Sequence, residues 1–238
     1  MSKKNIENEI KNMGLYEKLD LIEAIGDSGS SSFTGKNSEF LKNLSHDEEG
    51  EVRAKVAEIL VLSNSSFTEK ILINLLKDKD ELVRIHACDS LCVSNSCIVI
   101  NHLKDRVLKD KSSLVRGYAA LSIGDIASNR NCDFKELEVF FTKVLAKERV
   151  NWVKLNFYKA LYLIGDESYL DLLISELKNR SYRSRCLIVN ILSDLVSKHN
   201  LFLIRTALTE RLEIEKTVAV RSTIEKTLLI LEENIKGK

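Results

Sequence analysis

The sequence predicts an all-α solenoid, a fold of stacked antiparallel helix pairs, on three observations. A Val-Arg pair opens an apolar run at four places: Val52-Arg53, Val83-Arg84, Val115-Arg116 and Val220-Arg221. With Val153 included, successive anchors lie 31, 32, 38 and 67 residues apart, and periods near 33 are typical of helical repeats. The 238 residues also contain no proline, so helices run without their strongest breaker.

Polar joints divide the chain into helix pairs. Residues 1–26 predict two capping helices, 27–38 a flexible Ser/Gly-rich loop, and 39–238 the repeats, all within one domain of about six to seven pairs. We expect Gly26 to adopt the left-handed conformation that ends the second capping helix. The pairs after the loop are expected at 38–45 with 49–63, 67–77 with 80–93, 97–109 with 113–127, 133–147 with 150–164, 167–178 with 181–198, and 200–213 with 216–234.

The second helix of each pair carries an apolar stripe. Counted from the anchor valine as position zero, apolar residues recur at +4, +8 and about +11, which lie on one side of a 3.6-residue helix. One pair cannot bury this stripe alone, so neighbouring pairs are expected to stack around a continuous core. The predicted core residues are Val56, Leu60, Ala87, Leu91, Ala119, Ile123, Phe157, Leu161, Ile164, Ile224, Leu228 and Leu231.

Composition excludes several classes of protein. Lys+Arg 36 against Asp+Glu 35 gives a net charge of +1, so no global field favours nucleic acid or an acidic membrane. The charge is uneven, however, with 12 basic and 17 acidic residues in 1–100 against 24 and 18 in 101–238. The sequence shows no apolar signal segment and no membrane span. We therefore expect a cytoplasmic protein whose five cysteines are reduced thiols.

Three short motifs resemble a known repeat family. They are Asp80-Glu81-Leu82-Val83-Arg84, Glu49-Gly50-Glu51-Val52-Arg53 and the closing Ile164-Gly165-Asp166. On these motifs the chain resembles the HEAT repeat family, particularly the HEAT-like repeats of the phycobilisome-lyase type. A second Gly-Asp, at Gly124, lies only nine residues after its valine, so Gly124 is expected inside a helix at a close-packing point. The resemblance implies a binding surface and carries no catalytic residue to this chain.

The repeated cations are interpreted as structural. They recur at one helical position beside a core valine, and the family resemblance implies pairing with acidic residues between neighbouring repeats. Such bidentate pairs would fix the stacking geometry. In the degenerate repeat around Tyr182, either Arg183 or Arg185 is a candidate for the same role. The predicted ladder comprises Arg53, Arg84, Arg116, Lys154 and Arg221.

Two patterns suggest a cofactor site but lack the residues or the spacing that such a site requires. The loop from Gly29 to Asn37 resembles a nucleotide-binding loop, but five residues separate Gly29 from Gly35, and Asn37 stands where a hydroxyl residue is required. His86, Cys88, Cys92, Cys97 and His102 lie close in sequence, but their spacing matches no zinc site. We therefore expect no cofactor, no metal and no catalytic residue.

Variable positions in the fixed frame are the candidate binding residues. Positions +3 and +6 of the second helices lie off the apolar stripe, so in the family's geometry they would coat the concave face. The alternative for these residues is an ordinary solvated surface. The candidates are Lys55, Glu58, His86, Asp89, Tyr118, Trp152, Asn156, Lys159 and Arg185.

Two functions follow from these candidates. The first is a non-enzymatic scaffold, adaptor or immunity-type inhibitor whose partner is another protein, with no membrane and no small-molecule substrate. The second is a DNA-binding or DNA-repair protein, because aromatic and basic residues interleave in the C-terminal half. The HEAT-like alkylpurine DNA glycosylases are the family considered there. Those enzymes use tryptophans with a catalytic aspartate, whereas this chain has only Trp152, with Asn156 one turn on.

Overall fold

The computed structural model describes residues 3–129, 132 and 134–236. These described residues form fourteen α-helices and four short 3₁₀-helices and contain no strand. The predicted all-α repeat architecture is therefore confirmed. The chain forms two compact units, unit 1 at Met1–Ala146 and unit 2 at Lys147–Lys238. The prediction that both belong to one domain stays a prediction.

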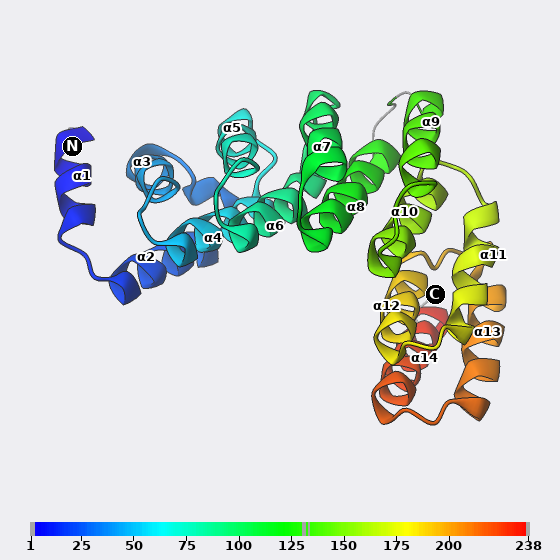
Figure 1. Cartoon of the computed structure of the whole chain (residues 1–238). Coiled ribbons are helices and arrows are strands. Elements are labelled where there is room, and N and C mark those ends of the chain that lie inside the picture. Colours follow the sequence, from blue (N-terminus) through cyan, green and yellow to red (C-terminus); the bar gives the residue numbers. More distant parts are fainter. Residues whose placement is uncertain (1–2, 130–131, 133, 237–238) are drawn as a thin grey trace. The chain divides into compact units, whose positions relative to one another are not determined.

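Unit 1 contains two layers of helices (Figure 1). The second helices α2, α4, α6 and α8 pack against one another in sequence order, and the first helices α3, α5 and α7 cover one side of them. The bounds are α1 (Lys3–Lys11), α2 (Leu15–Asp27), η1 (Ser30–Ser32), α3 (Gly35–Leu44), α4 (Gly50–Ile59), η2 (Leu60–Leu62), α5 (Ser66–Leu75), α6 (Glu81–Ser90), η3 (Leu91–Val93), α7 (Ile98–Lys109), α8 (Ser113–Asn129) and α9 (Phe134–Leu145).

Unit 2 repeats the two-layer arrangement. The second helices α10, α12 and α14 pack in order, with the first helices α11 and α13 in the other layer. Its bounds are α10 (Asn151–Leu163), α11 (Ser168–Ser175), η4 (Glu176–Lys178), α12 (Tyr182–Asp194), α13 (Leu201–Ile214) and α14 (Val218–Lys236).

The predicted core stripe is buried in both units. Of its twelve residues, eleven are buried, and Leu228 alone is half-buried. In unit 2 the stripe of α12 and α14 packs with Ile204 and Leu208 of α13, which closes the core on its outer side. Each stripe is therefore shared between repeats, as the inability of one pair to bury it requires.

Local capping explains where several helices begin. The Asp80 carboxylate accepts a hydrogen bond from the backbone N–H of Leu82, and the Ser65 and Ser181 hydroxyls accept from backbone N–H groups at the starts of α5 and α12. These side chains satisfy donors that the first helical turn leaves unpaired. The polar residues between the apolar runs thus begin the helices as well as separate them.

The prediction for Gly26 and the following loop is wrong in part. Gly26 lies inside α2, and positive φ values occur instead at Gly29, 76°, and Gly35, 55°. A Cβ on Gly26 would lie 3.2 Å from Cγ2 of Ile59, so this glycine permits close packing against the neighbouring repeat. Within the segment expected as a flexible loop, η1 forms, Phe33 is buried and α3 begins at Gly35. An apolar Phe33 on its own gave no periodic signal, so its burial was not predicted.

Two other glycines behave as predicted. Gly165 follows the end of α10 with φ of 107°, a conformation that glycine alone adopts at low cost. Gly124 is buried within α8. The same Gly-Asp dipeptide therefore ends one helix and lies inside another, as the distances from the anchor valines indicate.

The prediction that all five cysteines are reduced is wrong for one pair. Cys97 and Cys132 form a disulfide with Cα atoms 6.3 Å apart, a separation suited to a bridge. The bridge joins Cys132 to Cys97 at the start of α7, a contact between residues 35 apart that sequence spacing did not predict. Cys88, Cys92 and Cys186 are free. Cys88 is buried, and burial raises the pKa of its thiol far above the ordinary value.

Candidate functional site

Arg53 joins two successive repeats of unit 1. Its Nε and Nη2 donate to the two carboxylate oxygens of Asp78 at 2.7 and 2.8 Å, while Nη1 donates to the backbone carbonyls of Asp47 and Glu48. The first contact reaches the next repeat, and the second closes the turn of its own repeat. One guanidinium therefore sets both the turn and the stacking.

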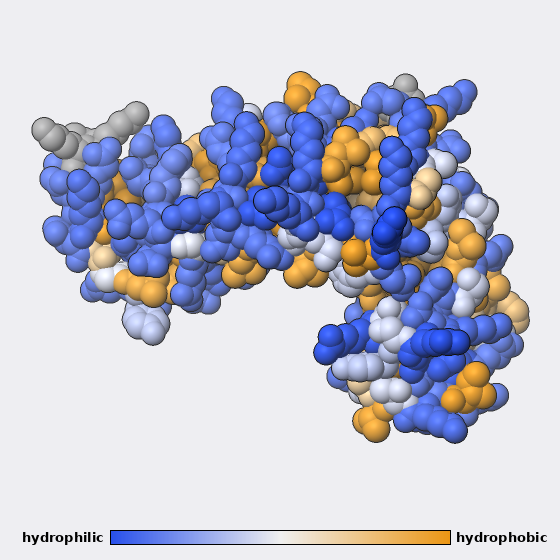
Figure 2. All heavy atoms as spheres, in the orientation of Figure 1, coloured by the Kyte–Doolittle hydropathy of each residue, from blue (hydrophilic) through white to orange (hydrophobic). Residues whose placement is uncertain are grey.

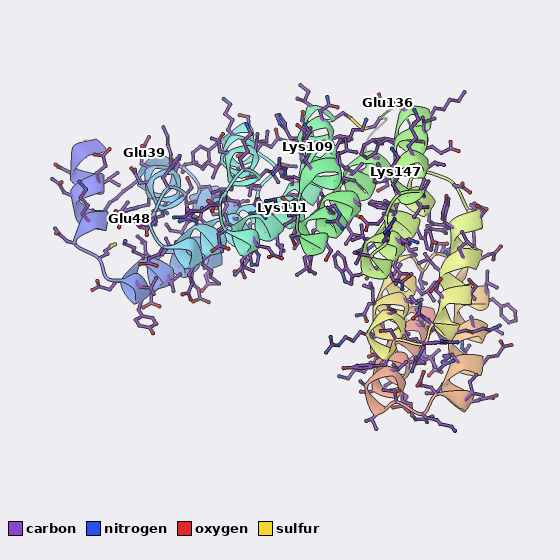
Figure 3. The ribbon with its side chains drawn as sticks, viewed as in Figure 1. Glu39, Glu48, Lys109, Lys111, Glu136 and Lys147 are labelled. Atoms are coloured by element: carbon purple, nitrogen blue, oxygen red, sulfur yellow. A yellow bond between two sulfur atoms is a disulfide. The ribbon has the colours of Figure 1, made fainter. Side chains whose placement is uncertain are left out.

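Arg84 makes the same set of contacts one repeat later. It donates to both oxygens of Asp110 at 2.8 and 3.0 Å and to the carbonyl of Asp78 at 2.9 Å. Arg116 continues the turn contact through the carbonyls of Asp110 and Lys111. Figure 3 labels Glu48 and Lys111, which mark two of these turns.

Arg185 belongs to this ladder, so its prediction as a partner-binding residue is wrong. It is 7% exposed and donates to both oxygens of Glu215 at 2.7 and 2.9 Å, as well as to the carbonyl of Asn179. The open choice between Arg183 and Arg185 is thereby decided. Arg183 is exposed and lies over the ring of Tyr182.

The acceptors of the ladder follow a rule that sequence reasoning missed. Each stands six residues before a ladder cation, and its side-chain oxygen accepts the backbone N–H two residues further on, at 2.8 to 3.0 Å. This contact is an Asx-type turn that shapes the joint between the paired helices. The constant six-residue spacing was the available signal. The residues are Asp47, Asp78, Asp110, Glu148, Asn179 and Glu215.

The remaining ladder positions vary in chemistry. Lys18 of α2 extends the pattern by binding Asp47 at 2.8 Å. Arg221 donates to the carbonyl of Glu215 and lies 3.5 Å from Glu225 in its own helix. For Lys154 we find no hydrogen bond or ion pair of the side chain within the described part of the chain. The ladder is therefore strongest where arginine meets a carboxylate.

The ladder carboxylates are held in their charged form. Burial raises the pKa of Asp78, but the hydrogen bonds from Arg53 and from the backbone N–H of Asp80 outweigh it, so the pKa is lowered overall. The same balance lowers the pKa of Asp110 beside Arg84 and that of Glu215 beside Arg185 and Arg211. These pairs consequently stabilise the fold as ion pairs at neutral pH.

The second helices of unit 1 present a defined stripe away from the core. It comprises positions −1, +3, +6 and +10 from the anchor valine, spaced as one face of a helix. Most of its residues are exposed and the others half-buried. We call it the second-helix face of unit 1: Glu51, Lys55, Glu58 and Leu62 beside α4, Leu82, His86, Asp89 and Val93 beside α6, and Leu114, Tyr118, Leu121 and Asp125 on α8.

The predicted binding residues of unit 1 all lie on this face. Glu58 and Asp89 are exposed, and Lys55, His86 and Tyr118 are half-buried. The Lys55 ammonium lies 3.5 Å from the Glu58 carboxylate in the same helix. Burial, followed by the charge of Asp89, raises the pKa of Tyr118, which keeps its hydroxyl a hydrogen-bond donor.

Four exposed aliphatic residues on the face were not predicted. Leu82 and Leu114 occupy position −1 and are 50% and 41% exposed, while Leu62 and Val93 occupy position +10 and are 48% and 37% exposed. Isolated hydrophobic atoms appear along the lower edge of unit 1 in Figure 2, where the second helices lie. Extending the registers from +3 and +6 to −1 and +10 would have found these residues.

The predicted partner-binding residues of unit 2 are less accessible to a partner than those of unit 1. Asn156 is fully buried, and neither of its side-chain amide atoms has a hydrogen-bond partner, so its prediction as a surface residue is wrong. The register of Asn156 determines the side of the helix on which it lies. It does not determine whether another element covers that side. Lys159 is bound to Asp194 at 2.8 Å, and Trp152 is half-buried.

Among the residues that the structure describes, no group of three or more His, Cys, Asp or Glu side chains is placed to hold a metal ion. None of the helices in the described ranges has both the length and the apolar character needed to cross a bilayer.

Comparison with known families agrees with this geometry. The family model described as HEAT repeats matches residues 37–124, the stretch that contains the Arg53 and Arg84 joints. Residues 37–124 are HEAT repeats. No curated protein matches the chain in sequence.

One solved structure shares the fold of this chain. The complex of CpcE and CpcF of phycocyanin lyase from Nostoc sp. PCC7120 is similar at a TM-score of 0.63 and 15% identity, covering 97% of this chain and 95% of that one. Human deoxyhypusine hydroxylase in complex with glycerol gives a TM-score of 0.47 at 13% identity, covering 97% of each chain. At 15% identity the similarity to the phycocyanin lyase structure is one of fold alone, and no conclusion is drawn from the second structure.

Proposed function

We propose that the chain is a non-enzymatic protein-binding scaffold, acting as an adaptor or an immunity-type inhibitor, and that it binds its partner through the second-helix face of unit 1. The observation that carries this proposal is the pattern of exposed aliphatic residues at matched registers. Leu82 and Leu114 lie at one end of adjacent helices, and Leu62 and Val93 lie at the other. Exposed apolar contacts combined with polar groups are typical of protein interfaces.

The polar residues between these contacts favour a protein over a nucleic acid. The face carries four carboxylates, on Glu51, Glu58, Asp89 and Asp125, against the single amine of Lys55. A surface of this sign repels phosphates, which dominate nucleic-acid affinity. We therefore expect a partner with cationic side chains flanked by apolar groups.

The DNA-binding alternative has lost part of its basis in unit 2. Arg185 is buried against Glu215, and Lys159 is paired with Asp194. Lys178, Arg180 and Arg183 remain as exposed cations in that region. DNA binding would require affinity that falls steeply with salt and is lost in Arg183→Glu; flat, negligible binding at low salt would exclude it.

A pulldown from the source cell with a matched control tests the proposal. Leu82→Glu combined with Leu114→Glu places two charges on the second-helix face, whereas Leu108→Glu alters an equally exposed leucine on the first helix α7. The protein retained by the wild type should be lost with the double variant and kept with the control. Equal retention by all three proteins would reject the second-helix face as the binding surface.

A further inference from the structure

A furrow runs between the first helices α11 and α13 of unit 2. It consists of two hollows of about 330 and 320 Å³ that share Asp171. The first is lined by Ile174, Leu177, Ala207 and Ile214 with charged residues around them. The second continues past Glu167, Ser168 and Leu203 at the starts of the two helices. We call the two hollows together the outer furrow.

The walls of the furrow are one face of each helix. The lining residues 171, 174, 175 and 178 on one side and 207, 210, 211 and 214 on the other are spaced three and four residues apart. Leu177 is buried in the furrow, Ala207 has a side chain too small to fill the space, and Ile214 is 66% exposed. Figure 2 shows hydrophobic atoms among the hydrophilic surface over α11 and α13.

The charges around the furrow are unequal. In the described part of unit 2, the carboxylates of Glu167, Asp171 and Glu210 have no ion pair or hydrogen bond. Arg211 is already bound to Glu215, so Lys178 is the lining cation without such a partner there. Carboxylates beside an apolar trough favour a ligand that supplies both apolar and cationic groups.

We propose that the outer furrow docks a basic amphipathic helix of a partner protein. Its apolar stripe would lie over Ile174, Ala207 and Ile214, and its Lys or Arg side chains would meet Asp171 and Glu210. From residue 167 to residue 178 the wall is about 17 Å long, which accommodates roughly three turns of helix. Helix-in-groove binding uses this combination of spaced apolar anchors and flanking charges. The surface lies on the first-helix layer of unit 2 and is independent of the function proposed for unit 1.

The test uses two sets of labelled peptides of about 14 residues, long enough for roughly three to four turns. Both sets share leucines at helical spacing and vary the other stripe positions among apolar residues; one set has Lys at the flanking positions and the other has Glu. Fluorescence anisotropy measures binding to the full chain. The tightest Lys peptides should bind at least about tenfold more tightly than their Glu counterparts. The double variant Asp171→Lys with Glu210→Lys should reverse that order.

A matched pair of tryptophan variants locates the peptide. Ala207→Trp fills the furrow and should weaken binding by about tenfold or more, whereas Thr206→Trp adds the same side chain at an exposed neighbouring position of α13 and should leave binding unchanged. Absence of saturable binding in both sets, or unchanged binding to Ala207→Trp, overturns the proposal. If sedimentation shows a dimer that Ala207→Trp dissociates, a second copy covers the furrow and the partner-helix proposal is wrong.

Discussion

The joints of unit 1 and the first joint of unit 2 are built from different chemistry. Arg53 and Arg84 each hold both oxygens of a carboxylate in the next repeat. Lys154 occupies the same register in α10, and the acceptor position of the following repeat holds the neutral Asn179. The Asn179 amide donates to Glu176 at 2.7 Å, and no contact from Lys154 to it is found among the described residues.

In this joint both the cation and the acceptor differ from those of unit 1, whereas Lys18 keeps a carboxylate partner in Asp47. Arginine presents a planar fork that matches a carboxylate, whereas lysine is a point charge that gains less from that geometry. A buried carboxylate opposite lysine would lose its hydration and regain less of that free energy than it does opposite arginine. Asn179 keeps the turn contact with the backbone N–H of Ser181 while avoiding that charge. The turn is thus common to both joints, and the ion pair is not.

Breaking the most buried ion pair should have the largest effect. Glu215 is almost fully buried, and in Arg185→Met its remaining cationic partner would be Arg211. We expect the free energy of unfolding to fall by about 3–5 kcal/mol, as for other buried pairs that lose one partner. Urea unfolding measures it. Arg205→Met, in the exposed pair with Glu232, is the control and should change stability by less than about 1 kcal/mol. A similar loss in both variants would contradict the ladder role.

Acid should weaken the charged joints but not the neutral one. The folded-state pKa values of Asp78, Asp110 and Glu215 are lowered, so their contribution to stability is fully present above the ordinary carboxyl pKa, about 4. It is lost as the pH falls through the lowered values. The free energy of unfolding, measured in urea at pH 7, 5, 4 and 3, should therefore decline most steeply below pH 4. Arg84→Met should reduce that steepness, because Asp110 loses its principal hydrogen-bond donor; an unchanged slope would refute the assignment.

Installing the missing ion pair should have a smaller effect of opposite sign. Lys154→Arg combined with Asn179→Asp recreates the residue pair of the unit 1 joints. We expect a gain of about 1 kcal/mol in the free energy of unfolding, since part of the ion-pair energy offsets desolvation. Asn179→Asp alone should gain less, because lysine lacks the fork. A double-mutant cycle in urea measures the coupling, and no coupling between the two changes would show that the registers are not equivalent.

Much of the fold could be predicted from the sequence because helical periodicity is local. The period of the Val-Arg anchors placed the helix pairs within a few residues, and the stripe at +4, +8 and +11 identified the core. The ladder acceptors were missed because they lie in polar joints, where spacing from the next arginine is the only signal. The Cys97–Cys132 bridge depends on contacts between distant segments, which periodicity does not report.

The candidate site was predicted in direction but not in environment. Position +3 lies off the core stripe by its register, yet Tyr118 there is half-buried and Asn156 fully buried. The register of a residue determines the side of the helix on which it lies, while its exposure depends on what packs over that side. The exposed leucines Leu82 and Leu114 were missed for a different reason, since apolar residues off the core stripe were not considered as binding residues.

We propose that each repeat-linking second helix of unit 1 carries a fixed joint on one side and a variable binding face on the other. Leu82 and Arg84 stand two residues apart on α6, one on the face and one in the ladder. Measuring both urea stability and partner retention for Leu82→Glu and Arg84→Met tests that separation directly. We predict that Leu82→Glu abolishes retention with stability changed by less than about 0.5 kcal/mol, as expected for an exposed residue. Arg84→Met should lower the free energy of unfolding by more than about 2 kcal/mol. The folded fraction of that variant should still retain the partner. Destabilisation by Leu82→Glu with retention intact would contradict the account.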